Sequence, residues 1–161
     1  MDARAAELIA VLQLLPHPEG GYYRETHRSA LQVTPADSRG PRAALTTIHF
    51  LLPAGEISRW HRVGSDEVWH FLDGAVLELH QADSEFEAIH TFALGPYGEA
   101  AQPTRVVPAG CWQAAHSTGA YTLVGCTVGP GFEFADFELL RDCPRERSIQ
   151  ESRHPRFTTF L

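Results

Sequence analysis

The first hydrophobic residues of the chain recur at helical spacing. They lie three or four positions apart on one face: Leu8, Val11, Leu12 and Leu15. Asp2 is a residue type that caps helix N-termini, whereas Pro16 and Pro18 cannot continue a helix. The pattern therefore predicts one amphipathic helix over about residues 2–15.

The pattern changes further along the chain to short β-rich runs separated by turn residues such as Asp73-Gly74 and Pro108-Ala-Gly110. After an extended piece at Tyr22–Arg28, the expected strands are Leu45–Leu52, Ser58–Val63, Glu67–Leu72, Ala75–Gln81, Glu87–Leu94, Thr104–Val107, Trp112–His116, Tyr121–Val128 and Phe132–Leu139. So many strands at such close spacing predict an all-β sandwich or jelly roll rather than βαβ units.

A chain of 161 residues fits one domain. We expect residues 1–161 to form it, with the helix at about 2–15, a barrel at about 20–140, and a tail at 141–161 that is irregular or a short helix. No linker or internal repeat divides the sequence.

Charge and cysteine content restrict the partners and the location. The net charge is −7 and no run of basic residues stands out, so neither nucleic acid nor an anionic membrane is an expected partner. The apolar run Leu8–Leu15 is too short to span a bilayer, and acidic residues precede it, so no signal peptide is expected. Three cysteines without a C-x-x-C pair fit a reducing, cytoplasmic setting.

The segment Gly55–Gly74, GEISRWHRVGSDEVWHFLDG, carries the clearest chemistry. Side chains alternate between the two faces of a strand, so Glu67, Trp69 and Phe71 share one face. The preceding strand can present His61 to the same space. We therefore predict a cavity that His61 and Glu67 line together, with Trp69 and Phe71 as apolar walls.

These residues lie in a segment that resembles the first motif of the cupin superfamily, and Pro108-Ala-Gly110 resembles the start of the second. The resemblance extends to the small single-domain cupin-5 family, whose reaction is uncharacterised. It rests on a Leu-rich N-terminal helix and on HPEGGYYRETHRS (His17–Ser29), TTIHFLLP (Thr46–Pro53), HRVGSDEVWHFLDG (His61–Gly74), LELH (Leu77–His80), PAGCWQAA (Pro108–Ala115) and LVGCTVGPGFEFADFELL (Leu123–Leu140). It implies a single cupin jelly-roll barrel, or double-stranded β-helix, with a short N-terminal helix, and usually a homodimer.

In metal-binding cupins the first motif supplies two His and a Glu, and the second supplies another His. His61 and Glu67 match two of these positions, but Val63 and Gln113 occupy the others. A stable transition-metal site normally needs three or four strong ligands. We therefore expect no metal cofactor; a divalent metal, if bound, would use His61, Glu67 and Gln113.

Two further histidines are not expected to join this set. His80 lies in a strand-like run, where a hydrogen-bonded structural role is the more common one. His116 follows Gln113 by three residues and would point to the opposite face of its strand.

The resulting hypothesis is a cupin that binds a small polar compound, sugar- or nucleotide-like, in its barrel. Gln113, Trp69, Phe71, Tyr23 and Arg24 are the expected ligand-binding residues. His61 and Glu67 form an acid/base pair that could support metal-independent isomerisation or epimerisation, as a similar His-centred arrangement does in some cupin sugar epimerases. A metal-dependent cupin enzyme with the incomplete ligand set and a non-catalytic structural or storage barrel are the alternatives, so catalysis itself stays open.

Overall fold

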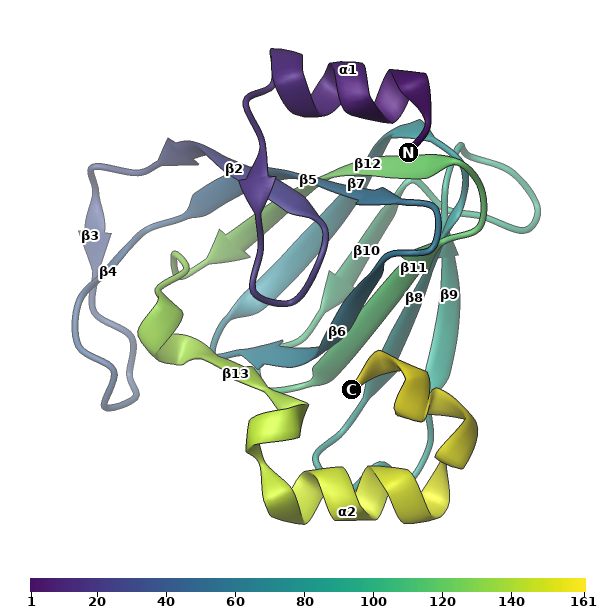
Figure 1. The fold of residues 1–161 in the computed structure, drawn as a ribbon. Helices are drawn as coiled ribbons and strands as arrows, with labels where there is room; N and C mark the ends of the chain where they lie inside the picture. Colours follow the sequence, from purple (N-terminus) through teal and green to yellow (C-terminus); the bar gives the residue numbers. More distant parts are fainter.

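The computed structural model describes all 161 residues, and most of its strands form two antiparallel sheets that face each other (Figure 1). The strands are β1 (Leu15–Pro16), β2 (Tyr22–Arg28), β3 (Gln32–Val33), β4 (Arg42–Ala43), β5 (Thr46–Pro53), β6 (Ile57–Val63), β7 (Asp66–Gly74), β8 (Leu77–Ala82), β9 (His90–Leu94), β10 (Thr104–Val107), β11 (Trp112–Ser117), β12 (Tyr121–Gly129) and β13 (Phe137–Leu139). The helices are α1 (Ala3–Val11) and α2 (Pro144–Arg153), and 3-10 turns form η1 (Phe134–Asp136), η2 (Leu140–Asp142) and η3 (Pro155–Phe160).

The six-stranded sheet has the order β1-β2-β5-β12-β7-β10, and the five-stranded sheet has the order β13-β6-β11-β8-β9. A separate two-stranded ribbon pairs β3 with β4. The predicted all-β jelly roll with a short N-terminal helix is confirmed, and most strands differ from the expected ranges by only a residue or two.

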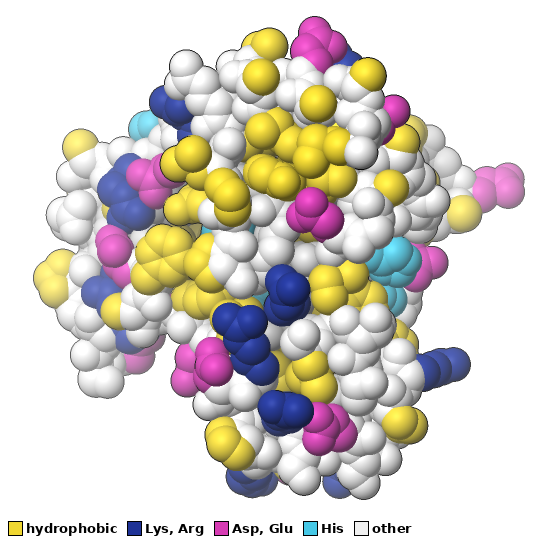
Figure 2. Space-filling view, viewed as in Figure 1, with side chains coloured by type: hydrophobic (Ala, Val, Ile, Leu, Met, Phe, Trp, Pro, Cys, Tyr) yellow, Lys and Arg dark blue, Asp and Glu magenta, His cyan; other side chains and the backbone are white.

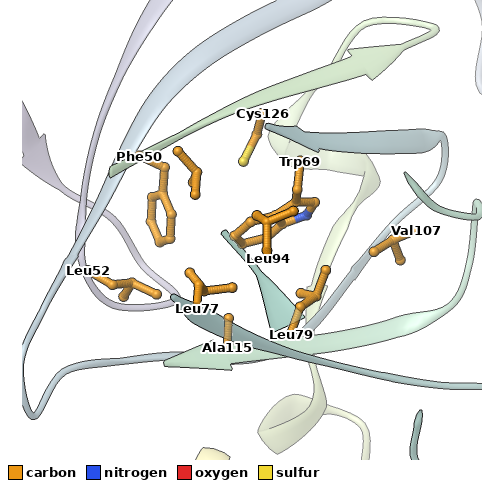
Figure 3. Close-up of a cluster of buried hydrophobic side chains, with 10 residues drawn as sticks. Phe50, Leu52, Trp69, Leu77, Leu79, Leu94, Val107, Ala115 and Cys126 are labelled. Carbon is orange, nitrogen blue, oxygen red and sulfur yellow. The ribbon is translucent and has the colours of Figure 1, made fainter. Parts of the chain in front are cut away.

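One hydrophobic cluster packs between the two sheets. Phe50, Trp69 and Cys126 come from the six-stranded sheet, while Leu77 and Leu79 come from β8 of the other (Figure 3). This cluster follows from alternation, because every second residue of each strand points inward.

The N-terminal helix is shorter than its hydrophobic pattern predicts. Asp2 caps it as expected, accepting hydrogen bonds from the backbone N–H groups of Arg4 and Ala5. The helix ends at Val11 rather than near residue 15, because Gln13 takes a left-handed conformation with φ of 53°. That turn brings Leu14 into a cluster on the outside of the six-stranded sheet.

The segment Phe132–Leu139 was expected as one strand, but only its last three residues are β-structure. Before them lies the η1 turn, whose Asp136 carboxylate accepts hydrogen bonds from Arg42 on β4 and from Arg39 just before that strand. These contacts between distant parts of the sequence keep the first part of the segment out of the regular hydrogen bonding of a β-strand.

The C-terminal tail forms α2 and η3, which lie against the outside of the five-stranded sheet, at the opposite end of the molecule from α1 (Figure 1). A second hydrophobic cluster anchors the tail, including Trp60, Phe86, Trp112, Leu140 and Phe160. On the face shown in Figure 2, hydrophobic side chains gather in the upper half below α1, and basic side chains lie below them towards α2. Neither helix combines the length and hydrophobicity that crossing a membrane would need.

Candidate functional site

A cavity of about 310 Å³ opens between the two sheets. Its walls come from β2, β5, β6, β7 and β12, from the turn before β2, and from the phenylalanine-rich segment after β12. This volume is at the lower end of the range of small-molecule sites.

Four of the residues expected at the site line this cavity: Tyr23, His61, Glu67 and Trp69. His61 on β6 and Glu67 on β7 therefore face one space, as strand alternation predicts. Val63 also lines the cavity. The position at which a metal-binding cupin carries its second histidine thus points inward and presents an isopropyl group.

Gln113 lies behind the cavity wall and is fully buried. Its Oε1 accepts a hydrogen bond of 2.9 Å from Trp69 Nε1, and its Nε2 donates one of 2.6 Å to Glu67 Oε2. Both ends of the amide are therefore engaged with the protein. Gln113 positions Glu67 and Trp69 and does not itself reach a ligand in the cavity.

Phe71 and Arg24 do not line the cavity either. Phe71 packs against the hydrophobic cluster further along β7. Arg24 is exposed and its guanidinium donates to the side chain of Gln13, because Tyr23 and Glu25, one residue away on each side, take the inward positions.

The turn before β2 supplies two site residues that the sequence reasoning missed, His17 and Glu19. Glu19 is only 6% exposed. Its Oε2 lies 3.3 Å from His61 Nε2 and 3.2 Å from His17 Nδ1, and its Oε1 accepts a 2.7 Å hydrogen bond from Ser58 Oγ. The segment HPEGGYYRETHRS, already prominent in the family resemblance, was the available signal.

Backbone contacts hold this turn against β6. Arg59 N donates to Glu19 O at 2.8 Å, and Gly20, with φ of 112°, approaches Ile57 so closely that a Cβ there would lie 2.1 Å from Ile57 O. Only glycine fits this position. The Gly20 backbone therefore allows the Glu19 carboxylate to reach the buried His61 ring.

An irregularity in β2 decides which polar side chains reach the cavity rim. The pairing of β2 with β5 shifts between Glu25 and His27, so Arg28 rather than His27 lines the cavity. Arg28 forms ion pairs of 2.8 Å with Glu25 and 2.7 Å with Glu133. The guanidinium is thus flanked by two carboxylates, and its side chain is 37% exposed at the rim.

The ring of His61 is held at both nitrogens. Nδ1 lies 2.7 Å from the backbone oxygen of Arg59, so it donates to that carbonyl. Nε2 can then donate to Glu19 only when the imidazole carries both protons. The geometry therefore favours an imidazolium–carboxylate pair of His61 and Glu19.

The two buried carboxyl groups have pKa values displaced in opposite directions. Burial alone would raise the pKa of Glu19, but the charges of His61 and His17 and the hydrogen bonds from His17 and Ser58 lower it below its ordinary value. For Glu67, burial is the largest effect and raises the pKa, although the His61 charge and the Gln113 hydrogen bond oppose it. Burial also raises the pKa of the neighbouring Cys126 thiol well above its ordinary value.

The positions that resemble the metal ligands of cupins do not present a full donor set in this cavity. Val63 has no ligand atom, Gln113 is bound at both ends by Glu67 and Trp69, and His61 is bound by Arg59 O and Glu19. The single group of three His, Cys, Asp or Glu ligand atoms within 4.8 Å of one another lies elsewhere, at Glu78, His80 and His116.

Comparison with known proteins places this chain in a family. The family described as "Cupin superfamily (DUF985)" matches residues 6–140, so the chain belongs to that family. A hypothetical protein from Leishmania major is similar at 32% identity, with a TM-score of 0.78, over 92% of this chain and 97% of that one. A Shewanella oneidensis protein is similar at 35% identity, with a TM-score of 0.75, over 91% and 94%.

More distant structures share the fold alone. An oxalate decarboxylase from Bacillus subtilis is 14% identical, with a TM-score of 0.59, over 85% of this chain and 33% of that one. The comparison with curated proteins gives no match. The family and the fold are therefore established, and the activity has to be argued from the site.

The opposite pKa displacements predict opposite effects of two isosteric substitutions on stability. Glu19→Gln should lower the free energy of unfolding by about 2 kcal/mol at pH 7, because the ion pair with His61 and the charged acceptor of the Ser58 hydrogen bond are lost. The loss should fade as pH falls through the lowered folded-state pKa of Glu19. Glu67→Gln should raise the free energy of unfolding by about 1 kcal/mol at pH 8, where the native carboxylate is ionised and desolvated.

The gain from Glu67→Gln should disappear in acid, as pH falls through the raised folded-state pKa of Glu67 and the native carboxyl becomes neutral. Urea unfolding of both variants and the native protein measures these differences from pH 8 down to pH values well below the unfolded-state pKa of glutamate, about 4.3. Curves that shift in the same direction for both variants would contradict the assignment of opposite pKa displacements.

Proposed function

We propose that this protein binds a small, neutral hydroxycarbonyl compound of the sugar class in its cavity and isomerises or epimerises it by proton transfer without a metal. The observation that carries the proposal is a pair of buried carboxyl groups, Glu19 and Glu67, which line one cavity with His61 and whose pKa values are displaced in opposite directions. Neighbouring titratable groups whose pKa values are shifted in opposite directions are typical of acid/base sites.

The walls of the cavity support a neutral ligand with apolar faces. Tyr23, Trp69 and three phenylalanines of the segment after β12 line it, and such rings can stack on the C–H faces of a sugar. Arg28 is the single arginine on the lining, and two glutamates already neutralise it. A phosphate-bearing, nucleotide-like ligand would find no free cation there, so an uncharged compound is the better fit.

Glu67 is the proton-transfer group in this proposal. Its raised pKa brings it closer to the working pH, where a carboxylate is an effective general base. It removes the proton next to the substrate carbonyl, and the C–H electron pair moves to form an enediolate. For the isomer, the adjoining hydroxyl proton passes to the former carbonyl oxygen and Glu67 returns its proton to the neighbouring carbon. For the epimer, the intermediate turns its opposite face to Glu67 before the proton returns to the same carbon.

His61 supplies the positive charge that this step needs. The Glu19 carboxylate lies against the imidazolium at Nε2, and the backbone oxygen of Arg59 fixes the orientation of the ring. An imidazolium in a buried site stabilises the negative charge that develops on the substrate oxygen. Glu19 is then a positioning residue that acts through His61.

Solvent exchange tests the proposal. The native protein should incorporate deuterium from D₂O next to the carbonyl of at least one member of a panel of aldoses and ketoses, followed by proton NMR. Glu67→Gln and His61→Asn should each slow the exchange at least tenfold, a typical contribution of one acid/base or electrostatic group. Binding, followed by tryptophan fluorescence, should change less than exchange does.

His27→Asn is a matched control, because His27 is an exposed histidine on β2 outside the cavity. Saturable binding without exchange would favour a binding module and reject the catalytic step. Absence of both binding and exchange across the panel would contradict the proposed ligand class.

A further inference from the structure

A second cluster of polar side chains lies on the outside of the five-stranded sheet. Glu78 and His80 are two residues apart on β8, so they share a face, and His116 on β11 pairs directly with Glu78. Their neighbours along the two strands, Leu77, Leu79 and Ala115, point into the core. This cluster is therefore separated from the cavity by the thickness of the sheet.

The three side chains can present one ligand atom each to a common point. Their ligand atoms all lie within 4.8 Å of one another, and His116 Nε2 is 3.7 Å from Glu78 Oε2. In a tetrahedral site with metal–ligand bonds of about 2.1 Å, neighbouring ligand atoms are about 3.4 Å apart. Modest side-chain rotations would therefore close the site around an ion.

Hydrogen bonding within the protein leaves these ligand atoms available. His80 Nδ1 lies 2.9 Å from Thr91 Oγ1, which leaves Nε2 of the same ring as a lone-pair donor. A hydrogen bond at the second ring nitrogen is usual for a metal-bound histidine, because it fixes the orientation of the ring. His116 Nδ1 is buried without a partner, and the 3.7 Å separation from Glu78 is too long for a hydrogen bond.

Aromatic side chains bury one side of this cluster, and the other side is open to solvent. His80 is 3% exposed beneath Phe157 and Phe160, whose ring centroids lie 5.1 and 4.9 Å from that of His80. The side chains of Glu78 and His116 are 44% and 35% exposed, so an ion can enter and can keep a water ligand. In Figure 2, histidine surface lies beside an acidic side chain on the side of the molecule where β8 and β9 run.

We propose that Glu78, His80 and His116 form a binding site for a first-row divalent transition metal, with zinc as the best fit. Two imidazole nitrogens and one carboxylate oxygen suit zinc, whereas magnesium and calcium prefer oxygen ligands alone. The site is independent of the cavity and of the activity proposed there. Because Phe157 and Phe160 cover His80, the bound ion also stabilises the docking of the C-terminal segment on the sheet.

Titration of the full, tag-free chain with zinc chloride tests the site by calorimetry, with equilibrium dialysis and elemental analysis for stoichiometry. We expect one zinc per chain and a higher melting temperature in its presence. Glu78→Gln and His116→Ala should each weaken binding at least tenfold, since each removes one of three protein ligands. Glu78→Gln is isosteric at an exposed position, so it keeps the fold intact.

His27→Ala is the control for loss of an exposed histidine, and His61→Ala is the control for the cavity; both should bind zinc as the native chain does. Absence of one-to-one binding, or equal binding by the native chain and Glu78→Gln, would overturn the proposal and indicate adventitious ion binding only. Loss of zinc in His61→Ala but not in His116→Ala would also overturn it, by placing the ion in the cavity.

Discussion

Replacement of Gly20 by alanine is expected to lower the free energy of unfolding by about 4 kcal/mol, among the largest effects of a single substitution. The new methyl carbon would lie 2.1 Å from the backbone oxygen of Ile57, in a residue whose φ of 112° already disfavours a side chain. Neither β6 nor the turn can move without breaking the hydrogen bond from Arg59 N to Glu19 O. Urea denaturation followed by tryptophan fluorescence measures the loss.

Gly55→Ala is the matched control. Gly55 also has a positive φ, of 81°, but no atom lies within 4 Å of the place that a Cβ would occupy. Gly55→Ala should therefore lower the free energy of unfolding by only about 1 kcal/mol, the cost of placing a side chain on a residue with positive φ. Equal costs at the two glycines would show that close approach to Ile57 does not limit the position of the turn.

Replacement of Gln113 by leucine, a residue of similar volume, is expected to cost about 3 kcal/mol. It leaves Trp69 Nε1 and Glu67 Oε2 without partners in a buried wall, and each unsatisfied group carries its full desolvation cost. The pKa of Glu67 should rise further, because the Gln113 hydrogen bond is one of the interactions that lower it. Denaturant unfolding and a titration of the Glu67 carboxyl by carbon NMR measure the two effects.

A double-mutant cycle separates the two hydrogen bonds of Gln113. Trp69→Phe removes the indole donor, so in that background the remaining cost of Gln113→Leu should fall by about 1 kcal/mol. Strictly additive costs would mean that the Trp69–Gln113 contact contributes nothing to the wall. A pKa of Glu67 unchanged by Gln113→Leu would contradict the role of Gln113 in holding the carboxylate.

Some residues of the site are positioned by alternation along their own strand, and others by contacts between segments far apart in the sequence. His61, Glu67 and Trp69 could be placed from the sequence, because alternation along β6 and β7 decides which side chains point inward. Alternation alone could not decide whether Arg24 or Glu25 faces the cavity. The pairing of β2 with β5 decides which side chains of β2 point inward. The shift between Glu25 and His27 then changes the phase again and brings in Arg28.

The missed pair, His17 and Glu19, lies in a turn, where no periodicity indicates a direction. Glu19 reaches His61 only because the turn packs on β6, a contact between segments far apart in the sequence. Gln113 presents the converse case. The sequence places it within the expected strand Trp112–His116 as a ligand-binding residue. The structure pairs it with His61 across the sheet and engages its side chain with Trp69 and Glu67, through contacts that only folding creates.

By itself the sequence determined the all-β jelly roll, the family, and an inward-facing set of His61, Val63, Glu67 and Trp69, because short-range alternation and turn residues control all of them. The tertiary structure decided the chemistry of that set. It paired His61 with Glu19, buried Glu67 against Gln113, and assembled Glu78, His80 and His116 across two strands on the opposite face. Burial and the approach of charges from distant segments set these properties, and neither is encoded in the order of residues along any one strand.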